Sequence, residues 1–212
     1  MGFLEAARCT WNALKAWWEA WLGLLLFGLV WVVCWATVVL GPPATFGFFF
    51  GVRWWMDEKE VKWEYVYRMA KKYFLASWLW CLANLVVFYA VFANYVFYSR
   101  FDNSNGRPFQ LLSLGMGFLW AAMQFYALPY YVLMEKKSLL AAWKNSLFTL
   151  LASPLFSLAL WIVLAVILVL HLAVAPVFLA GPGLVVVLAS MAVEDRIRKF
   201  GIREREAGRG DT

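Results

Sequence analysis

Two side-chain amides, Asn84 and Gln124, lie well inside long uncharged stretches of the chain. Counted from the basic ends of those stretches, at about 1.5 Å of rise per helical residue, the amides lie at depths of about 16 Å and about 14 Å. Amides at matching depth on neighbouring apolar helices can join the helices through a direct hydrogen bond. The pair therefore predicts a polar tie between two helices, with part of a polar pocket as the alternative.

The segment from Gly41 to Trp55 is a second candidate site, because prolines, glycines and aromatic residues are concentrated there ahead of a basic end. Its candidate residues are Pro42, Pro43, Ala44, Thr45, Gly47, Gly51 and Arg53. The prolines should stop the preceding helix, Thr45 can cap a new short helix, and the two glycines, one turn apart, leave that helix a bare face for close packing. We expect this helix to bury its phenylalanines against the bundle and to place Arg53 among lipid headgroups. It is either a structural corner or a gating or partner-docking element.

Residue patterns for catalysis or metal binding are missing from the sequence. It has no phosphate-binding glycine loop, no nucleophile elbow, no H-E-x-x-H motif and no paired carboxylates on one helix face. The single histidine, His171, has no companion ligand nearby, and Cys9, Cys34 and Cys81 cannot form a disulfide framework. The sequence therefore predicts no enzyme, no cofactor and no bound metal.

Four uncharged runs must position these residues. Each is longer than the stretch of about 20 apolar residues that crosses a bilayer. They are Ala20 to Val52, Tyr73 to Ser99, Pro108 to Met134 and Asn145 to Val193. The composition agrees, since 64% hydrophobic and 15% charged residues would leave a water-soluble globule short of polar surface. Lipid is therefore the expected solvent.

The predicted fold is an all-α integral membrane bundle, one domain over residues 1–200 with five transmembrane helices plus short interfacial helices. The last run is long enough for two helices, with a turn between His171 and Pro176 or, alternatively, at Gly181-Pro182-Gly183. We prefer the earlier turn and interpret Pro182 as a kink. The spans are approximately 21–40, 73–97, 111–133, 153–171 and 174–193, and residues 201–212 form a disordered cytoplasmic tail.

Three further helices are expected outside the spans. Residues 2–19 mix aromatic and charged side chains as a helix lying in the interface does. A charged but periodic helix follows Asp57 and leads into the second span. Ser138 can cap another short helix that runs through Leu151.

The distribution of Lys and Arg predicts the orientation. Five spans would place 15 of these residues on one side of the membrane and 4 on the other, so the N-terminus should lie outside and the C-terminus in the cytoplasm. Because the basic residues flank apolar spans, the net charge of +6 indicates attraction to anionic lipid and no nucleic-acid partner.

Parts of the chain resemble the YesL family of bacterial membrane proteins. The resemblance lies in the first span with its Gly41-Pro-Pro-Ala-Thr corner, in Val52-Arg53-Trp54-Trp55, and in the segment from Glu64 to Phe74; the match is looser later in the chain. The matching positions are Pro43, Ala44, Thr45, Arg53, Lys72 and Phe74. The family is uncharacterised, and its members are often encoded beside carbohydrate-uptake transporters and sugar-degrading enzymes. The resemblance thus implies a bacterial plasma (inner) membrane protein with sugar-transporter subunits as possible partners.

Three functions follow in order of preference. The first is an accessory or regulatory partner in carbohydrate uptake, with the lipid bilayer as its surroundings. The second is a small transporter or channel subunit for a neutral solute, with Asn84, Gln124 and aromatic rings along the route. A membrane enzyme is disfavoured because no ionisable groups converge. The sequence leaves the oligomeric state open.

Overall fold

The computed structural model describes residues 2–58, 60, 62–100, 106–173 and 175–200, so the predicted tail 201–212 lies outside the described residues. Within the described ranges every regular element is an α-helix, which confirms the all-α class. The helices are α1 (Gly2–Glu19), α2 (Trp21–Ala36), α3 (Gly41–Glu58), α4 (Trp63–Lys72), α5 (Phe74–Ser99), α6 (Gly106–Leu133), α7 (Leu139–Ala152), α8 (Pro154–Ala173) and α9 (Ala175–Phe200).

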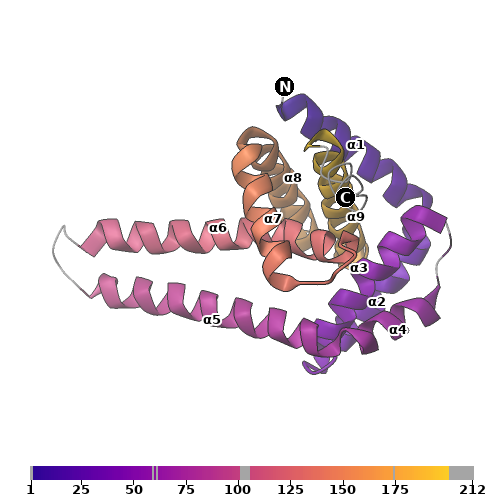
Figure 1. Cartoon of the computed structure of the whole chain (residues 1–212), viewed down its shortest axis with the longest axis horizontal. Helices are drawn as coiled ribbons and strands as arrows, with labels where there is room; N and C mark the ends of the chain where they lie inside the picture. The colour runs from indigo at the N-terminus through magenta and orange to yellow at the C-terminus, as the bar shows by residue number, and fades with distance from the viewer. Residues whose placement is uncertain (1, 59, 61, 101–105, 174, 201–212) are drawn as a thin grey trace, which may run out of the picture.

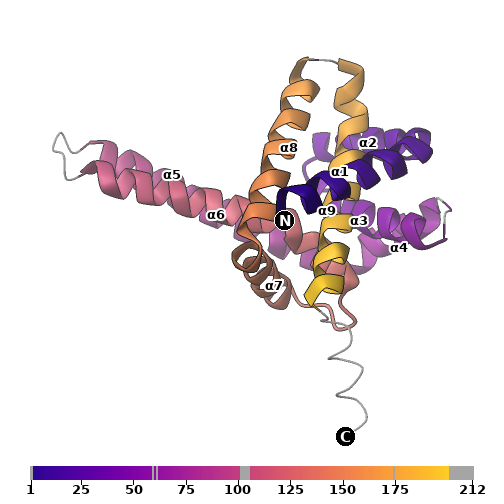
Figure 2. The same cartoon turned by 90° about the horizontal axis from the view of Figure 1, so that it is seen from above.

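Two helical hairpins dominate the shape. Helices α5 and α6 form a long hairpin that projects away from the body made by the other helices (Figure 1). Helices α8 and α9 form a second hairpin, which runs crosswise to the first (Figure 2). The predicted spans are therefore not aligned as one parallel bundle.

The predicted number of membrane crossings is not confirmed by the lengths and hydropathy of the helices. Among the described residues, α5 and α6 are each long and apolar enough to cross a bilayer. The pairs α1–α2 and α7–α8 pass the same test only jointly, and they are bent by 88° and 103°. The chain thus has the apolar helices of a membrane protein, with two candidate spans or up to four, and the five-span count is not confirmed.

The first predicted span, 21–40, is too long. Helix α2 contains only 16 residues, about 24 Å at about 1.5 Å per residue, against the about 30 Å of a bilayer core. It ends at Ala36, where the Thr37 hydroxyl donates to the carbonyl of Cys34. Val38 then takes a left-handed backbone conformation with φ of 60°, which a β-branched side chain rarely adopts. The chain turns there and returns as α3.

The short helices and the late turn lie close to their predicted places. The Ser138 side chain accepts a hydrogen bond from the amide of Ala141, so it caps α7 as expected. Helix α8 ends at Ala173 and α9 begins at Ala175, inside the interval predicted for the turn. Pro182 lies within α9, which continues through the charged residues up to Phe200.

Helix α3 lies at the centre of the packing. Phe46 is 1% exposed and its ring makes edge contacts with Trp80 of α5 and Tyr131 of α6, with centroids 6.1 and 5.3 Å away. Phe50 stacks on Tyr73 between α4 and α5 at 4.9 Å. The expected burial is observed for Phe46, Phe48 and Phe50. Helix α3 thus joins the base of the α5–α6 hairpin to the body.

Candidate functional site

Thr45 of α3 links this helix to α2 through hydrogen bonds. Its hydroxyl accepts hydrogen bonds from the indole nitrogens of Trp31, at 2.9 Å, and Trp35, at 3.2 Å. The same hydroxyl donates to the carbonyl of Gly41 at 2.9 Å, which completes its bonding capacity. The predicted role as a helix cap is wrong, because Thr45 lies inside α3 and bonds backward along it.

The prolines begin α3 and do not end α2. Pro42 and Pro43 are buried in the first turn of α3, where a missing backbone donor costs nothing, while α2 has already ended at Ala36. Ala44 follows in the same turn, and its amide donates to the carbonyl of Leu40. The Trp35 ring packs closely on Gly41, since a Cβ there would come within 2.6 Å of the ring. The corner is thus a tightly packed structural unit.

The bare face made by Gly47 and Gly51 is filled by α4. A Cβ on Gly47 would lie 2.9 Å from the carbonyl oxygen of Val66, and a Cβ on Gly51 would lie 2.6 Å from Cγ2 of the same valine. Only glycine allows the two backbones to approach this closely. The predicted groove therefore has an occupant within the chain.

Arg53 does not face the headgroups as a free cation. Its guanidinium forms an ion pair with Glu194 of α9 and another, at 2.7 Å, with Asp57 one turn along α3. The side chain is 19% exposed. The headgroup prediction is wrong because a carboxylate on a distant helix lies within reach, which only the tertiary arrangement decides.

Asn84 and Gln124 belong to one network, but they do not bond each other. Asn84 donates to the carbonyl of Trp80 at 2.8 Å and accepts from Trp120 at 3.0 Å. The Gln124 oxygen accepts from the indoles of Trp80, at 2.9 Å, and Trp143, at 3.4 Å. Indole donors therefore replace the predicted amide-to-amide bond.

One atom of this network has no partner. The Gln124 Nε2 atom is buried without a hydrogen bond in the described structure, while the other three polar amide atoms are engaged. A signal for the network was present in the sequence. Trp80 and Asn84, and likewise Trp120 and Gln124, are four residues apart and so share a helix face.

An ion-pair cluster between α1 and α9 was not predicted at all. Arg196 is 1% exposed and its guanidinium lies 3.8 Å from the centroid of the Phe156 ring. It donates to Glu5 at 2.7 Å and also to Asp195. Lys199 donates to the other oxygen of Glu5 at 2.8 Å. The bonds from Lys199 and Arg196 lower the pKa of Glu5 to about 2, so this carboxylate stays ionised.

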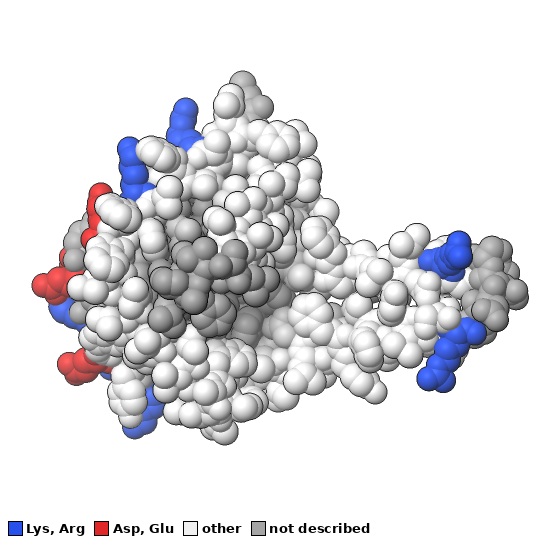
Figure 3. All heavy atoms as spheres, turned by 180° about the vertical axis from the view of Figure 1, so that it is seen from behind, with Lys and Arg blue, Asp and Glu red and all other residues white. Residues whose placement is uncertain are grey.

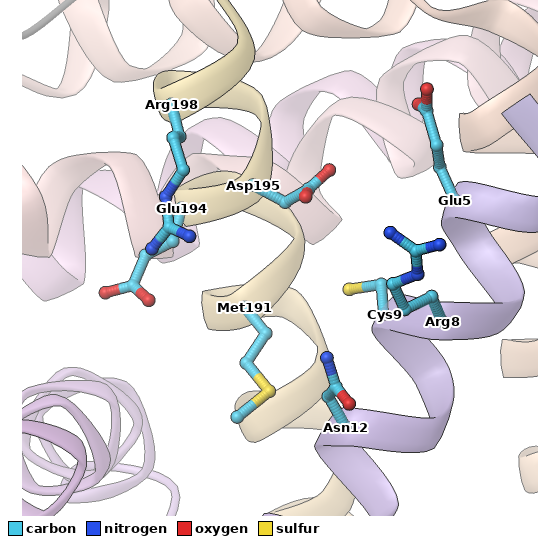
Figure 4. Close-up of a pocket in the computed structure, with 8 residues that line it drawn as sticks. All are labelled: Glu5, Arg8, Cys9, Asn12, Met191, Glu194, Asp195 and Arg198. Carbon is cyan, nitrogen blue, oxygen red and sulfur yellow. The ribbon is translucent and has the colours of Figure 1, made fainter.

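A cavity of about 230 Å³ opens beside this cluster, between α1 and α9 (Figure 4). Its lining consists of Glu5, Arg8, Cys9, Asn12, Met191, Glu194, Asp195 and Arg198. Burial raises the pKa of the Cys9 thiol to about 12, so the wall there is a neutral thiol. No spacing in the sequence could have indicated this site, because its two halves lie at opposite ends of the chain.

The same contacts do not support the predicted orientation. Glu5 touches Arg196 and Lys199, so the start of α1 lies beside the end of α9. An N-terminus outside and a C-terminus in the cytoplasm would hold these residues apart by a bilayer core of about 30 Å. The packing of α1 on α9 therefore lends the predicted orientation no support.

Among the described residues, no group of three or more His, Cys, Asp or Glu side chains is placed to hold a metal ion. His171 falls in α8 where side chains are outside the described part of the structure.

Comparison with known proteins adds no relative to this picture. No protein-family model, curated protein or solved structure matches the chain. The resemblance to the YesL family accordingly stays a prediction from the sequence.

Proposed function

We propose that the protein is an integral membrane protein that crosses the bilayer through the α5–α6 hairpin and acts as a non-catalytic accessory subunit in carbohydrate uptake. The exposure of α5 is the main support for the membrane assignment, while the carbohydrate role rests on the resemblance to the YesL family. Only Ser77 is buried among the 26 residues of α5, and a helix of that length spans about 39 Å. Its apolar side chains would be unstable in water and are suited to lipid.

The charge pattern of the hairpin supports the same assignment. Basic atoms mark its outer end, and its length toward the body shows no charge on the visible face (Figure 3). In sequence, no Lys, Arg, Asp or Glu occurs from Phe74 to Ser99 or from Pro108 to Leu133. Arg100 and Arg107 can reach headgroups on the far side of the bilayer.

Both termini are placed in the cytoplasm in this proposal. Gly2 packs on Leu155, Glu5 pairs with Arg196, and Arg53 pairs with Glu194. Four helix ends therefore meet, and we assign them to the cytoplasmic side of the membrane: the start of α1, the end of α3, the start of α8 and the end of α9. Helices α2 and α3 then enter and leave the apolar layer as a re-entrant pair.

The number of crossings is then even. It is two, because the α8–α9 hairpin runs crosswise to the α5–α6 hairpin and does not cross the bilayer with it (Figure 2). Arg8 and Lys15 then join the cytoplasmic residues, and Arg100 and Arg107 are the only 2 of 19 basic residues on the outer side. This bias is stronger than the one that five spans would give.

Cysteine labelling tests the orientation. In a variant without Cys9, Cys34 and Cys81, a membrane-impermeant thiol reagent added to intact cells should label Ser99→Cys. It should label Leu4→Cys only after permeabilisation, although Leu4 is 77% exposed. Labelling of Leu4→Cys in intact cells would place the N-terminus outside and contradict the even count.

Passage of a small neutral solute is a second candidate function. It is favoured by one observation, the buried and unpartnered Gln124 Nε2 atom beside Trp80 and Trp143. Amide donors next to aromatic rings suit the hydroxyl groups and apolar faces of sugars. The difference from the first function is that the chain would conduct the solute by itself.

Two transport measurements separate these functions. An accessory subunit predicts slower uptake of a labelled sugar in cells that lack the chain, and no swelling of proteoliposomes that contain only the purified chain in a sugar gradient. Swelling that is lost in Gln124→Leu would establish the second function. Normal uptake in the deletion strain for every sugar tested would remove the first.

A further inference from the structure

We infer that the cavity between α1 and α9 binds a phosphate-bearing anion, with the headgroup of an anionic phospholipid as its source. The cavity is the one lined by Glu5, Arg8, Cys9 and Asn12 of α1 and by Met191, Glu194, Asp195 and Arg198 of α9 (Figure 4). Its assignment to the cytoplasmic leaflet rests on the proposed orientation, whereas its chemistry does not.

The carboxylates of the lining are already neutralised by protein cations. Glu5 is paired with Arg196 and Lys199, and Asp195 is paired with Arg196. Glu194 is paired with Arg53. A bound cation would therefore have to displace an existing partner at each of these acids.

The two guanidinium groups of the lining, in contrast, have no carboxylate partner among the described residues. Arg8 and Arg198 have no ion pair with any residue that the structure describes, and both side chains are exposed. Together with its ion-pair partners the cavity has more cations than carboxylates. The cations are Arg8, Arg53, Arg196, Arg198 and Lys199, and the carboxylates are Glu5, Asp57, Glu194 and Asp195.

The side chains that line the cavity suit a phosphate that carries an organic substituent. The planar guanidinium fork matches pairs of phosphate oxygens, and the Asn12 amide can donate a further hydrogen bond. Cys9 is neutral and Met191 is apolar, so the wall does not repel an organic substituent. Basic pockets beside membrane helices on the cytoplasmic side bind anionic phospholipid headgroups.

Binding can be measured by tryptophan-detected thermal unfolding of the purified full chain in mild detergent. Adding phosphatidylglycerol should raise the unfolding temperature, and phosphatidylcholine, whose headgroup has no net charge, should raise it much less. Arg8→Gln and Arg198→Gln should each weaken the response, on the order of tenfold in the lipid concentration required. Arg68→Gln, which removes an exposed guanidinium from α4, is the matched control and should respond like the parent.

The outcomes are distinct. A response to glycerol 3-phosphate equal to that with phosphatidylglycerol would keep the phosphate site but identify a soluble ligand as its source. No response to either compound, or equal responses from the three variants, would overturn the inference. Because the assay uses solubilised protein, its result does not depend on the orientation that cysteine labelling tests.

Discussion

Placing leucine at both Gly47 and Gly51 is expected to destabilise the fold by about 1 to 3 kcal/mol per site. The two glycines face α4, and a Cβ on either would approach Val66 to 2.9 or 2.6 Å. Such distances force a helix to move, because the packing of the interior leaves no room for the added methylenes. The free energy of unfolding in mixed micelles, by denaturant titration, measures the effect.

Alanine variants at single sites refine this test. Gly51→Ala should cost at least as much as Gly47→Ala, because its Cβ would approach Cγ2 of Val66 to 2.6 Å and a valine in a helix has one strongly preferred rotamer, whereas the Cβ at position 47 would approach the Val66 carbonyl oxygen to 2.9 Å. Gly115→Leu is the matched control on the α5–α6 hairpin, since nothing lies within 4 Å of a Cβ there. If the control and the double variant melt alike, the close contact of α3 with α4 does not contribute to stability.

Replacing Arg196 by Met is expected to lower the free energy of unfolding by about 2 to 4 kcal/mol. The methionine retains most of the volume against Phe156 but removes the donors to Glu5 and Asp195. Both carboxylates stay partly exposed, at 31% and 48%, so water compensates for some of the loss. The expected cost is therefore below that of breaking a fully buried pair.

A double-mutant cycle with Glu5→Gln identifies the cause. If the cost arises from leaving Glu5 without its partner, the two changes together should cost less than the sum of the single changes. Lys144→Gln removes an exposed cation from α7 and should stay within about 0.5 kcal/mol of the parent. An Arg196→Met loss as small as that of Lys144→Gln would mean that the cluster does not join α1 to α9.

Local sequence patterns were sufficient to predict much of the fold. The helix over residues 2–19, the Ser138 cap, the interval of the late turn and the tight packing at Gly47 and Gly51 all follow from hydrophobic period, capping chemistry or glycine spacing. Each of these depends on residues within a few turns of one another. The extent of the first span was wrong because length and hydropathy alone do not reveal a turn at Val38.

The candidate sites depended on contacts between distant parts of the chain. For Thr45, Arg53, Asn84 and Gln124 the sequence identified polar groups that need partners, but the partners come from other helices: indoles for Thr45 and the two amides, and Glu194 for Arg53. A buried polar group must be satisfied, and which donor satisfies it is a matter of three-dimensional proximity.

The sequence by itself determined that the chain is helical and suited to lipid, because uncharged apolar runs and helical periodicity are local properties that no tertiary contact can reverse. Only the tertiary structure decided that Glu5 meets Arg196, that a cavity opens between α1 and α9, and that the start of α1 lies beside the end of α9. Ion pairs act over a few ångströms, and residues at opposite ends of the sequence come that close only after the helices between them have packed.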